Sequence, residues 1–326
     1  MKKHIASILF LFLLSTFQLI AQSHSVKRLG IEQGLSNNYV VSITQDKQGF
    51  LWFATEEGLN KFDGTRFTTY YKNDLTQDNQ GITGNELNRV YADTKHPIIW
   101  IATQRDGLNA YNYNEQTFTA YQHNPENPHS LITNDVTDIA PSTQHDDGLW
   151  ISTYYRGIEY LDITSGQFTH YNKSTVPSLP CDQTWTVLDG GDGNLYIGHV
   201  GSGFSIFSPK DKSVKNFRNE AGNPMSLPGN DVFCIIKDAN GNIWLGTNNG
   251  LALYDAANEN FITFKNNKND KYATLCSRIL SIRQLKDNRL WIASELNGIA
   301  ILNLKQSMFL SPEEISLEYI QEGADN

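Results

Sequence analysis

The stretch GFLWFATEEGLNKFDG, residues 49–64, holds an apolar run around Trp52, a glycine at 58, a second apolar run through Phe62 and an Asp-Gly turn. Nearly the same string returns at residues 242–256 as NIWLGTNNGLALYDA. Asn-Gly and Asp-Gly between apolar runs are hairpin signals. The chain is therefore built from copies of one hairpin-containing unit.

The unit returns six times at a nearly fixed period. Its cores are FLWFAT (50–55), IIWIAT (98–103), GLWIST (148–153), NLYIGH (194–199), NIWLGT (242–247) and RLWIAS (289–294). Their central aromatic residues, called anchors below, are Trp52, Trp100, Trp150, Tyr196, Trp244 and Trp291, spaced 46 to 50 residues apart. Such a period is typical of propeller and solenoid arrays.

Each unit contains four short apolar segments, which in the fifth unit are residues 232–236, 243–246, 251–254 and 261–264. A four-stranded antiparallel sheet that is apolar on both faces must bury each face against a neighbour. Radial packing of such sheets gives a propeller. We therefore predict an all-β fold, a β-propeller of four-stranded antiparallel blades with six complete blades. A sandwich would not repeat a near-identical string at a fixed period, and a β-helix has shorter coils.

Two positions of the unit have predicted structural roles. The anchor lies in the middle of a strand and should fill the gap between adjacent blades. A glycine follows each anchor and should take the turn into the third strand. These glycines are Gly58, Gly107, Gly157, Gly203, Gly250 and Gly298.

The N-terminus predicts export. MKKHIASILFLFLLSTFQLIAQ combines two lysines, an apolar run from Ile5 to Ile20 and a small residue before a cleavage site after Ala21. A retained membrane anchor is the alternative, but the run is short and is interrupted by polar residues. We predict a signal peptide at 1–21, a propeller domain at 22–326, and a periplasmic or extracellular location.

Charge and motif content exclude several functions. The formal net charge is −9, which disfavours nucleic acid and anionic lipid, so we expect no membrane contact after signal cleavage. Cys181, Cys234 and Cys276 lack zinc-site spacing, and Asp-rich turns such as 238–242 lack the pattern of an EF-hand loop. We expect hairpin turns there, and neither a metal nor a cofactor. No sequence motif of a catalytic site is present.

The string GLSNNYVVSITQDKQGFLWFATEEGLNKFDGTRFTTY, residues 34–70, resembles the two-component regulator propeller repeat. The segment VKRLGIEQGLSNNYV, residues 26–40, resembles the start of the sensors that carry this repeat. The resemblance implies the N-terminal periplasmic sensor propeller of a hybrid two-component system histidine kinase that controls polysaccharide-utilisation genes. Implied partners are an oligosaccharide ligand and a second propeller or partner subunit, in a dimer.

The resemblance also implies a longer parent protein. Sensors of this kind resemble two seven-bladed propellers, an immunoglobulin-like domain, a membrane helix, and kinase and regulator modules. The final segment ISLEYIQEGADN is expected to be the fourth strand of the sixth unit, followed by a loop. We therefore expect a chain cut from a seven-bladed propeller, with Val26 to Leu29 as the outer strand of the last blade.

Departures from the repeat mark candidate binding residues. The step from anchor to glycine is six residues in units one and five and seven in the others. The longer loops and the additional Trp185 supply aromatic faces and guanidinium groups, which suit sugar rings and carboxylates. The candidate ligand-binding residues are Arg105, Tyr154, Tyr155, Arg156, Trp185, His199 and Glu295. The alternative for each is a packing or surface role.

We predict that the chain itself is not an enzyme. One alternative is a secreted propeller lyase or glycosidase, which needs paired carboxylates or an Arg/His/Tyr cluster that converges on the axial face. Glu56, Asp106 and Glu295 lie in the appropriate loops. The other alternative is a scaffold that binds only protein.

Overall fold

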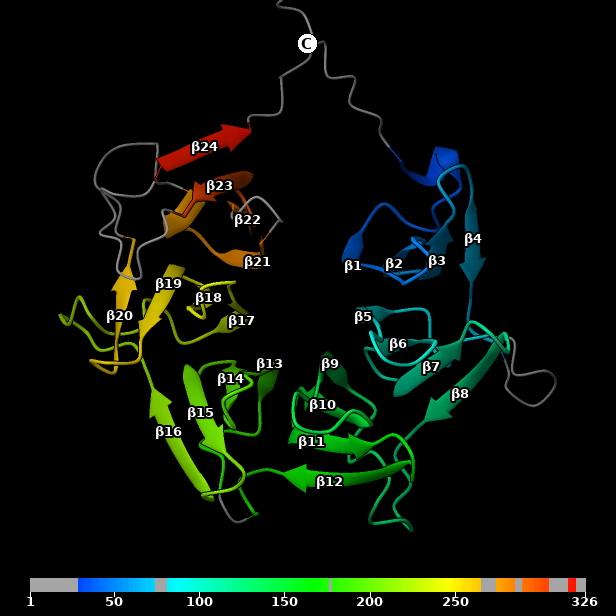
Figure 1. Cartoon of the computed structure of the whole chain (residues 1–326), viewed down its shortest axis with the longest axis horizontal. Helices are drawn as coiled ribbons and strands as arrows, with labels where there is room; N and C mark the ends of the chain where they lie inside the picture. Colours follow the sequence, from blue (N-terminus) through cyan, green and yellow to red (C-terminus); the bar gives the residue numbers. More distant parts are fainter. Residues whose placement is uncertain are drawn as a thin grey trace, which may run out of the picture.

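The computed structural model describes residues 29–73, 81–175, 178–264, 274–284, 289–304 and 316–320. Its strands form six four-stranded antiparallel sheets, arranged as successive blades of a ring (Figure 1). The predicted all-β propeller with six complete blades is confirmed. The signal peptide predicted at 1–21, and all but Leu29 of the strand predicted at 26–29, lie outside the described residues.

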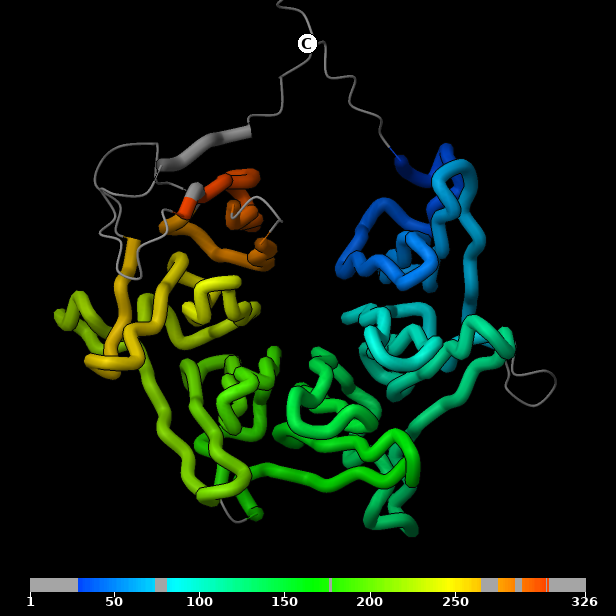
Figure 2. Tube along the Cα trace, viewed as in Figure 1, coloured from blue at the N-terminus to red at the C-terminus, as the bar shows by residue number. Residues whose placement is uncertain are grey.

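Within each blade the chain runs from an inner strand a through b and c to an outer strand d, as the colour sequence of the tube in Figure 2 shows. Blades one to three contain β1 (Val40–Gln45), β2 (Leu51–Thr55), β3 (Gly58–Phe62), β4 (Phe67–Tyr70), β5 (Leu87–Ala92), β6 (Ile98–Thr103), β7 (Leu108–Asn112), β8 (Thr117–Tyr121), β9 (Val136–Pro141), β10 (Gly148–Thr153), β11 (Gly157–Asp162) and β12 (Gln167–Tyr171). Blades four to six contain β13 (Thr184–Asp189), β14 (Leu195–His199), β15 (Phe204–Ser208), β16 (Ser213–Phe217), β17 (Val232–Lys237), β18 (Ile243–Thr247), β19 (Gly250–Asp255), β20 (Asn260–Thr263), β21 (Ile279–Gln284), β22 (Arg289–Ser294), β23 (Ile299–Asn303) and β24 (Ser316–Ile320).

Helical structure in the described residues is limited to short 3-10 segments, η1 (Ile31–Gln33) and η3 (Thr274–Cys276). No helix in this part of the chain is long and apolar enough to cross a membrane. The predicted strand at the end of unit six is confirmed, because β24 pairs antiparallel with β23.

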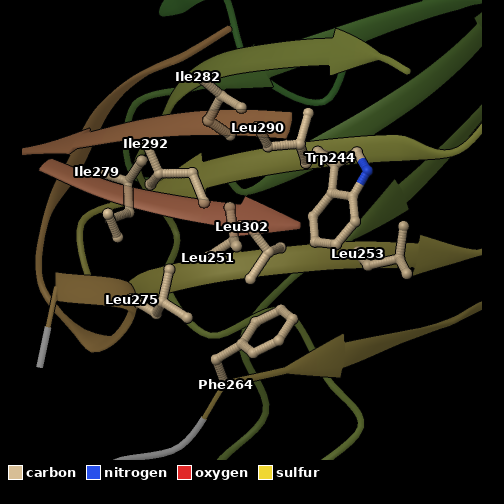
Figure 3. Packing of buried hydrophobic residues seen from close by; sticks show 11 residues of the cluster. Trp244, Leu251, Leu253, Phe264, Leu275, Ile279, Ile282, Leu290, Ile292 and Leu302 are labelled. Atoms are coloured by element: carbon tan, nitrogen blue, oxygen red, sulfur yellow. The ribbon is translucent and has the colours of Figure 1, made fainter. Parts of the chain in front are cut away.

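The core lies between neighbouring blades, and five of the six anchors fill it as predicted. Trp291, the anchor of blade six, is only partly buried and belongs to none of the core clusters. Trp52, Trp100, Trp150, Tyr196 and Trp244 are each at most 9% exposed, and each belongs to a cluster shared with the following blade. Figure 3 shows the last of these clusters, in which Trp244 and Leu251 of blade five pack beside Ile292 and Leu302 of blade six. Burial of these faces on both sides of a blade stabilises the ring.

A repeated hydrogen bond fixes the orientation of the anchors. The indole Nε1 donates to the aspartate that opens the a–b turn, at 2.7 Å for Trp52 and Asp46 and at 2.9 Å for Trp244 and Asp238. The Asp238 carboxylate also accepts from the backbone N–H groups of the turn. These bonds satisfy both the buried indole and the turn, as expected for hairpin turns.

The inner strands of consecutive blades pack against each other from β1 and β5 through to β17 and β21. No comparable packing joins β21 to β1 within the described residues. Ile43 of β1 is 53% exposed at this seam, and Ile299 of β23 is 38% exposed. The seventh blade expected from the resemblance stays a prediction, because it would lie outside the described residues.

Candidate functional site

The b–c loops and the connections between blades meet on one end of the ring, called the loop face below. The N–H of Gly157 donates to Asp182 O at 2.8 Å, and the N–H of Gly203 donates to Asn230 O at 2.8 Å. Each bond joins a b–c loop to the start of the next blade. Gly157 has a φ of 84°, and a Cβ there would come within 2.2 Å of Tyr171 O, so the predicted glycine turn is required.

A β-bulge lies near the start of every inner strand. The strand register shifts at Val41, Asn88, Thr137, Trp185, Phe233 and Leu280 in blades one to six. A bulge adds an unpaired residue and changes the direction of its side chain. Two of these six residues are aromatic, Trp185 and Phe233, and they belong to adjacent blades.

Four aromatic rings form a continuous ridge across blades three, four and five. The centroids of Tyr155 and Tyr154 lie 4.2 Å apart, those of Tyr154 and Trp185 lie 6.0 Å apart, and those of Trp185 and Phe233 lie 6.0 Å apart. All three contacts are edge-to-face, a favourable geometry for aromatic pairs. The structure therefore brings together three of the predicted binding residues in one group, called the aromatic ridge.

A cation extends the ridge to blade six. The guanidinium carbon of Arg278 lies 4.4 Å from the Phe233 ring centroid, and Arg278 Nη1 lies 3.3 Å from Glu295 Oε1. Glu295, predicted from its loop, thus joins the ridge through Arg278. Both side chains of this ion pair are more than 40% exposed, so the pair orients the guanidinium but adds little stability.

Sequence reasoning missed Phe233 and Arg278. Phe233 occupies the same position of blade five as Trp185 in blade four, directly after the first residue of the inner strand. Aligning the unit on the inner strand as well as on the anchors would have revealed it. Arg278 precedes an inner strand in a segment where the repeat has no fixed residue, so the sequence carries no comparable signal.

The two remaining arginines lie in exposed loops beside the ridge. Burial raises the pKa of the Asp135 carboxyl, and the positive charge of nearby Arg105 partly opposes this rise. Asp135 O in turn accepts from the N–H of Tyr154 at 3.1 Å. The N–H of Arg156 donates to Thr153 Oγ1, and its side chain extends into solvent. Both positions fit the predicted binding face.

His199 does not share this face. It is fully buried, its Nε2 lies 2.8 Å from Ser205 Oγ, and burial lowers its pKa to about 4. The prediction that its side chain lies at the rim is wrong. The reason is its place at the end of strand b, where Thr55 and Thr247 of other blades are also buried beneath the b–c loop.

The carboxylates considered for an enzyme do not form a pair. Asp106 lies 3.4 Å from Lys72 Nζ, and Glu295 is paired with Arg278. These two acids belong to blades two and six, which are not neighbours. No interaction joins Glu56 to either of them in the described part of the chain. The described part of the loop face therefore presents aromatic rings and cations.

Fold and site together define a class, a β-propeller whose loop face carries a continuous aromatic ridge. Comparison with known proteins identifies the repeat. A family model described as the two component regulator propeller matches residues 34–57 and 226–249. The chain therefore carries two segments that match this repeat.

Two relatives extend this finding. A crystal structure of the extracellular domain of a putative hybrid two-component system from B. thetaiotaomicron is 63% identical, with a TM-score of 0.80, over 92% of this chain and 37% of that chain. Histidine kinase P4 from Formosa agariphila is 42% identical over 66 residues, which are 20% of this chain and 5% of that protein. The chain thus spans a little over a third of the first relative and a small part of the second.

A more distant structure shows the fold alone. The extracellular domain of a putative one-component system from B. thetaiotaomicron has a TM-score of 0.68 and 21% identity over 88% of this chain. The combined findings support a sensor-type propeller like those found in extracellular domains of two-component systems.

Proposed function

We propose that this chain is the ligand-binding propeller of an extracytoplasmic two-component sensor. The observation that carries this proposal is the 63% identity to the extracellular domain of a putative hybrid two-component system. Because the chain covers 37% of that relative, the signal output would belong to the rest of a longer parent protein. The propeller would recognise the ligand and pass the binding energy on through a conformational equilibrium.

The proposed ligand is an oligosaccharide bound at the aromatic ridge. Tyr155 is 51% exposed, and its neighbours Tyr154 and Trp185 are partly exposed, so ring faces are available for sugar C–H groups. Arg156 and Arg278 lie at the two ends of the ridge and suit hydroxyls or an acidic group of a uronate or sulfate. Since the chain is acidic overall, stacking rather than long-range attraction would dominate the affinity.

The remaining parts of the proposal concern location and output. Cleavage after Ala21 would release the chain into the periplasm or the extracellular space. There it would pair with a second propeller or a partner subunit in a dimer, and ligand binding would control genes for polysaccharide use. Mass spectrometry of the mature protein should read Gln-Ser-His at the N-terminus, and an intact Met1 in the cytosol would contradict export.

Isothermal titration of the parent sensor's extracytoplasmic part against a panel of plant, fungal and host polysaccharide fragments tests the ligand proposal. The double variant Tyr155→Ala with Arg156→Ala should bind the recognised fragment at least tenfold more weakly, because it loses a stacking ring and a charged donor. A matched control is Tyr39→Ala, which removes a ring that is 61% exposed in blade one, away from the ridge.

Unchanged affinity in the double variant would exclude the ridge as the binding site. A transcriptional reporter for the regulated genes, measured in cells that carry the same variants, tests the sensor role separately. A response that persists without any binding by the propeller would reject the sensor assignment itself.

A further inference from the structure

Blade three departs from the repeat at the a–b turn. In blades one, two and five the anchor indole donates to an aspartate, which is Asp46, Asp93 or Asp238. The backbone N–H of this aspartate donates to the carbonyl oxygen of the residue two positions before the anchor. In blade three this place is taken by Ser142, whose N–H makes the same bond to Gly148 O at 2.8 Å. Blade four has Gly190 there, but the hydroxyl of its anchor Tyr196 donates to Asp192 instead.

The Trp150 indole consequently lacks the bond to an aspartate that Trp52, Trp100 and Trp244 make. Its Nε1 has no hydrogen-bond partner among the residues that the structure describes. Solvent can reach this atom, which distinguishes it from the fully buried polar atoms without a partner. A donor left without a partner at the edge of a core costs free energy unless water or a ligand accepts from it. Trp150 lines a pocket in which such an acceptor has room.

Two further departures shape this pocket. The cross-strand neighbour of Trp150 is Tyr160, and the two ring centroids lie 4.9 Å apart. The corresponding neighbours in the other blades are Lys61, Ala110, Ile206, Leu253 and Ile301. A Cβ on Gly148 would lie 2.3 Å from Tyr160 Oη, so glycine at this position makes room for the tyrosine. Three departures from one repeat therefore meet around one pocket.

The pocket has a volume of about 690 Å³ and lies between blades three and four, at the end of the ring opposite the loop face. Trp150, Tyr160 and Tyr171 form its aromatic part, and its acidic part consists of Asp146, Asp147, Asp162 and Asp189. Its size is within the range of small-molecule sites. We call it the blade-three pocket.

The polar groups of the pocket are complementary to hydroxyl groups. The hydroxyls of Tyr160 and Tyr171, like Trp150 Nε1, have no hydrogen-bond partner in the described part of the chain. Burial and the carboxylates of Asp162 and Asp147 raise the pKa of Tyr160, which keeps its hydroxyl protonated as a donor. Hydrogen bonds from Ser165 lower the pKa of Asp162, which keeps that carboxylate ionised as an acceptor.

The walls of the pocket are held in place by bonds between blades. Asp189 of blade four accepts from the N–H of Thr143 at 3.0 Å and from its hydroxyl at 2.6 Å. Asp147 lies 2.9 Å from His96 Nε2 of blade two and accepts from Thr164 Oγ1 at 3.2 Å. The carboxylates are thus fixed before any ligand enters, which lowers the entropic cost of binding.

From this arrangement we infer that the blade-three pocket binds a neutral saccharide. Ring faces beside donors and carboxylate acceptors match the alternating C–H and hydroxyl surface of a sugar. The four aspartates that line the pocket disfavour a uronate or a sulfated sugar. The site lies on the opposite end of the ring from the aromatic ridge and does not depend on it.

Titration of the full chain with maltose, cellobiose and mannobiose tests the inference, with digalacturonate and chitobiosamine as charged comparisons. Binding is followed through the ¹⁵N-indole resonance of Trp150, assigned with Trp150→Phe, and through calorimetry. At least one neutral disaccharide should shift this resonance at millimolar concentration. Digalacturonate should not shift it.

The variants use residues that the repeat itself accepts. Ser142→Asp restores the indole partner found in blades one, two and five, and Tyr160→Ala introduces the residue of blade two. Each should weaken binding roughly tenfold or more. Ser142→Asp should leave the melting temperature unchanged or higher, whereas Tyr160→Ala should lower it modestly because it removes a ring that packs on Trp150. Tyr155→Ala on the loop face is the matched control and should bind the disaccharide normally.

Three outcomes would overturn the inference. One is the absence of any Trp150 shift with all neutral disaccharides, which would leave a pocket that holds only water. Another is equal affinity in the wild type, Ser142→Asp and Tyr160→Ala. The third is binding of chitobiosamine alone, which would indicate a cation site instead of hydroxyl recognition. Loss of ridge binding in the parent sensor would not affect any of these readouts.

Discussion

Blades three and five have the same four strands but differ in how their anchors are satisfied. In blade five the Trp244 indole donates to Asp238, and Leu253 lies opposite it. In blade three the Trp150 indole has Ser142 in place of the aspartate and Tyr160 in place of the aliphatic residue. Blade five shows what the fold requires of a blade. At the positions where blade three differs, the side chains therefore line an open polar pocket instead of completing a closed core.

The largest expected effect comes from removing the two anchors. Trp244 is 1% exposed inside a closed cluster, so Trp244→Ala should lower the free energy of unfolding by about 3–5 kcal/mol. Trp150→Ala should cost about 1–2 kcal/mol less, because one edge of that ring already faces the pocket. Urea denaturation of both variants measures the difference. Equal losses would mean that Trp150 is packed as tightly as Trp244.

Blade four lies between these two blades and carries a buried histidine in its strand b. Burial lowers the pKa of His199 from 6.5 to about 4, so the folded chain holds the neutral form. The unfolded chain binds the extra proton below pH 6.5, and stability is therefore lost as the pH falls from about 6.5 towards 4. The shift corresponds to a loss of about 3 kcal/mol at the acid end of this window.

His199→Asn isolates this effect, because asparagine cannot take up a proton. Denaturation at pH 7 and at pH 4.5 should show a smaller acid loss in the variant than in the wild type. The ion pair of His170 and Glu159, with burial opposing it, raises the pKa of His170, but this contribution is present in both proteins and cancels in the comparison. The same acid loss in both proteins would reject the assignment to His199.

The framework of the molecule was predictable from the sequence because each blade repeats the same physical solution. Anchors such as Trp52 and Trp244 pack between blades, and glycines such as Gly157 turn into strand c with positive φ. A position that requires a large apolar side chain, or no side chain, accepts few residue types. The repeat can therefore be recognised in the sequence. The strands predicted for unit five lie within one or two residues of β17 to β20.

The candidate site was only partly predictable, because contacts between blades depend on the bulge and on burial. Tyr154, Tyr155 and Trp185 were identified from departures in the loops, and the structure places their rings in contact. His199 was misplaced because a loop position counted from the anchor does not distinguish the buried end of strand b from the exposed loop. The blade-three pocket was not predicted, because its polar residues come from separate turns of two blades that only the fold brings together.

A smaller effect should come from exchanging the turn residues of the two blades. Asp238→Ser in blade five leaves the Trp244 indole without its acceptor and should cost about 1–3 kcal/mol. The serine hydroxyl can still accept from the N–H groups of the turn, as Ser142 does in blade three. Ser142→Asp in blade three should cost nothing or stabilise by up to about 1 kcal/mol, since it supplies a missing acceptor. Thermal melting of both variants tests this asymmetry. A destabilised Ser142→Asp would show that the pocket geometry does not admit the carboxylate.

The smallest change in stability is expected at the aromatic ridge on the loop face. Tyr155 is 51% exposed and touches only the edge of the Tyr154 ring, so Tyr155→Ala should change the free energy of unfolding by less than about 0.5 kcal/mol. Trp185→Ala should cost more, about 1 kcal/mol, because Trp185 contacts rings on both sides.

Both ridge variants should nevertheless impair ligand binding in the parent sensor, and this separation of stability from binding is the useful measurement. A residue retained for packing loses stability when it is truncated, whereas one retained for a ligand loses affinity at nearly constant stability. Denaturation and calorimetry on the same two variants give both numbers. If Tyr155→Ala were to destabilise the fold as much as Trp150→Ala, the ridge would be a packing element of blade three. The proposal that the loop face binds the ligand would then be rejected.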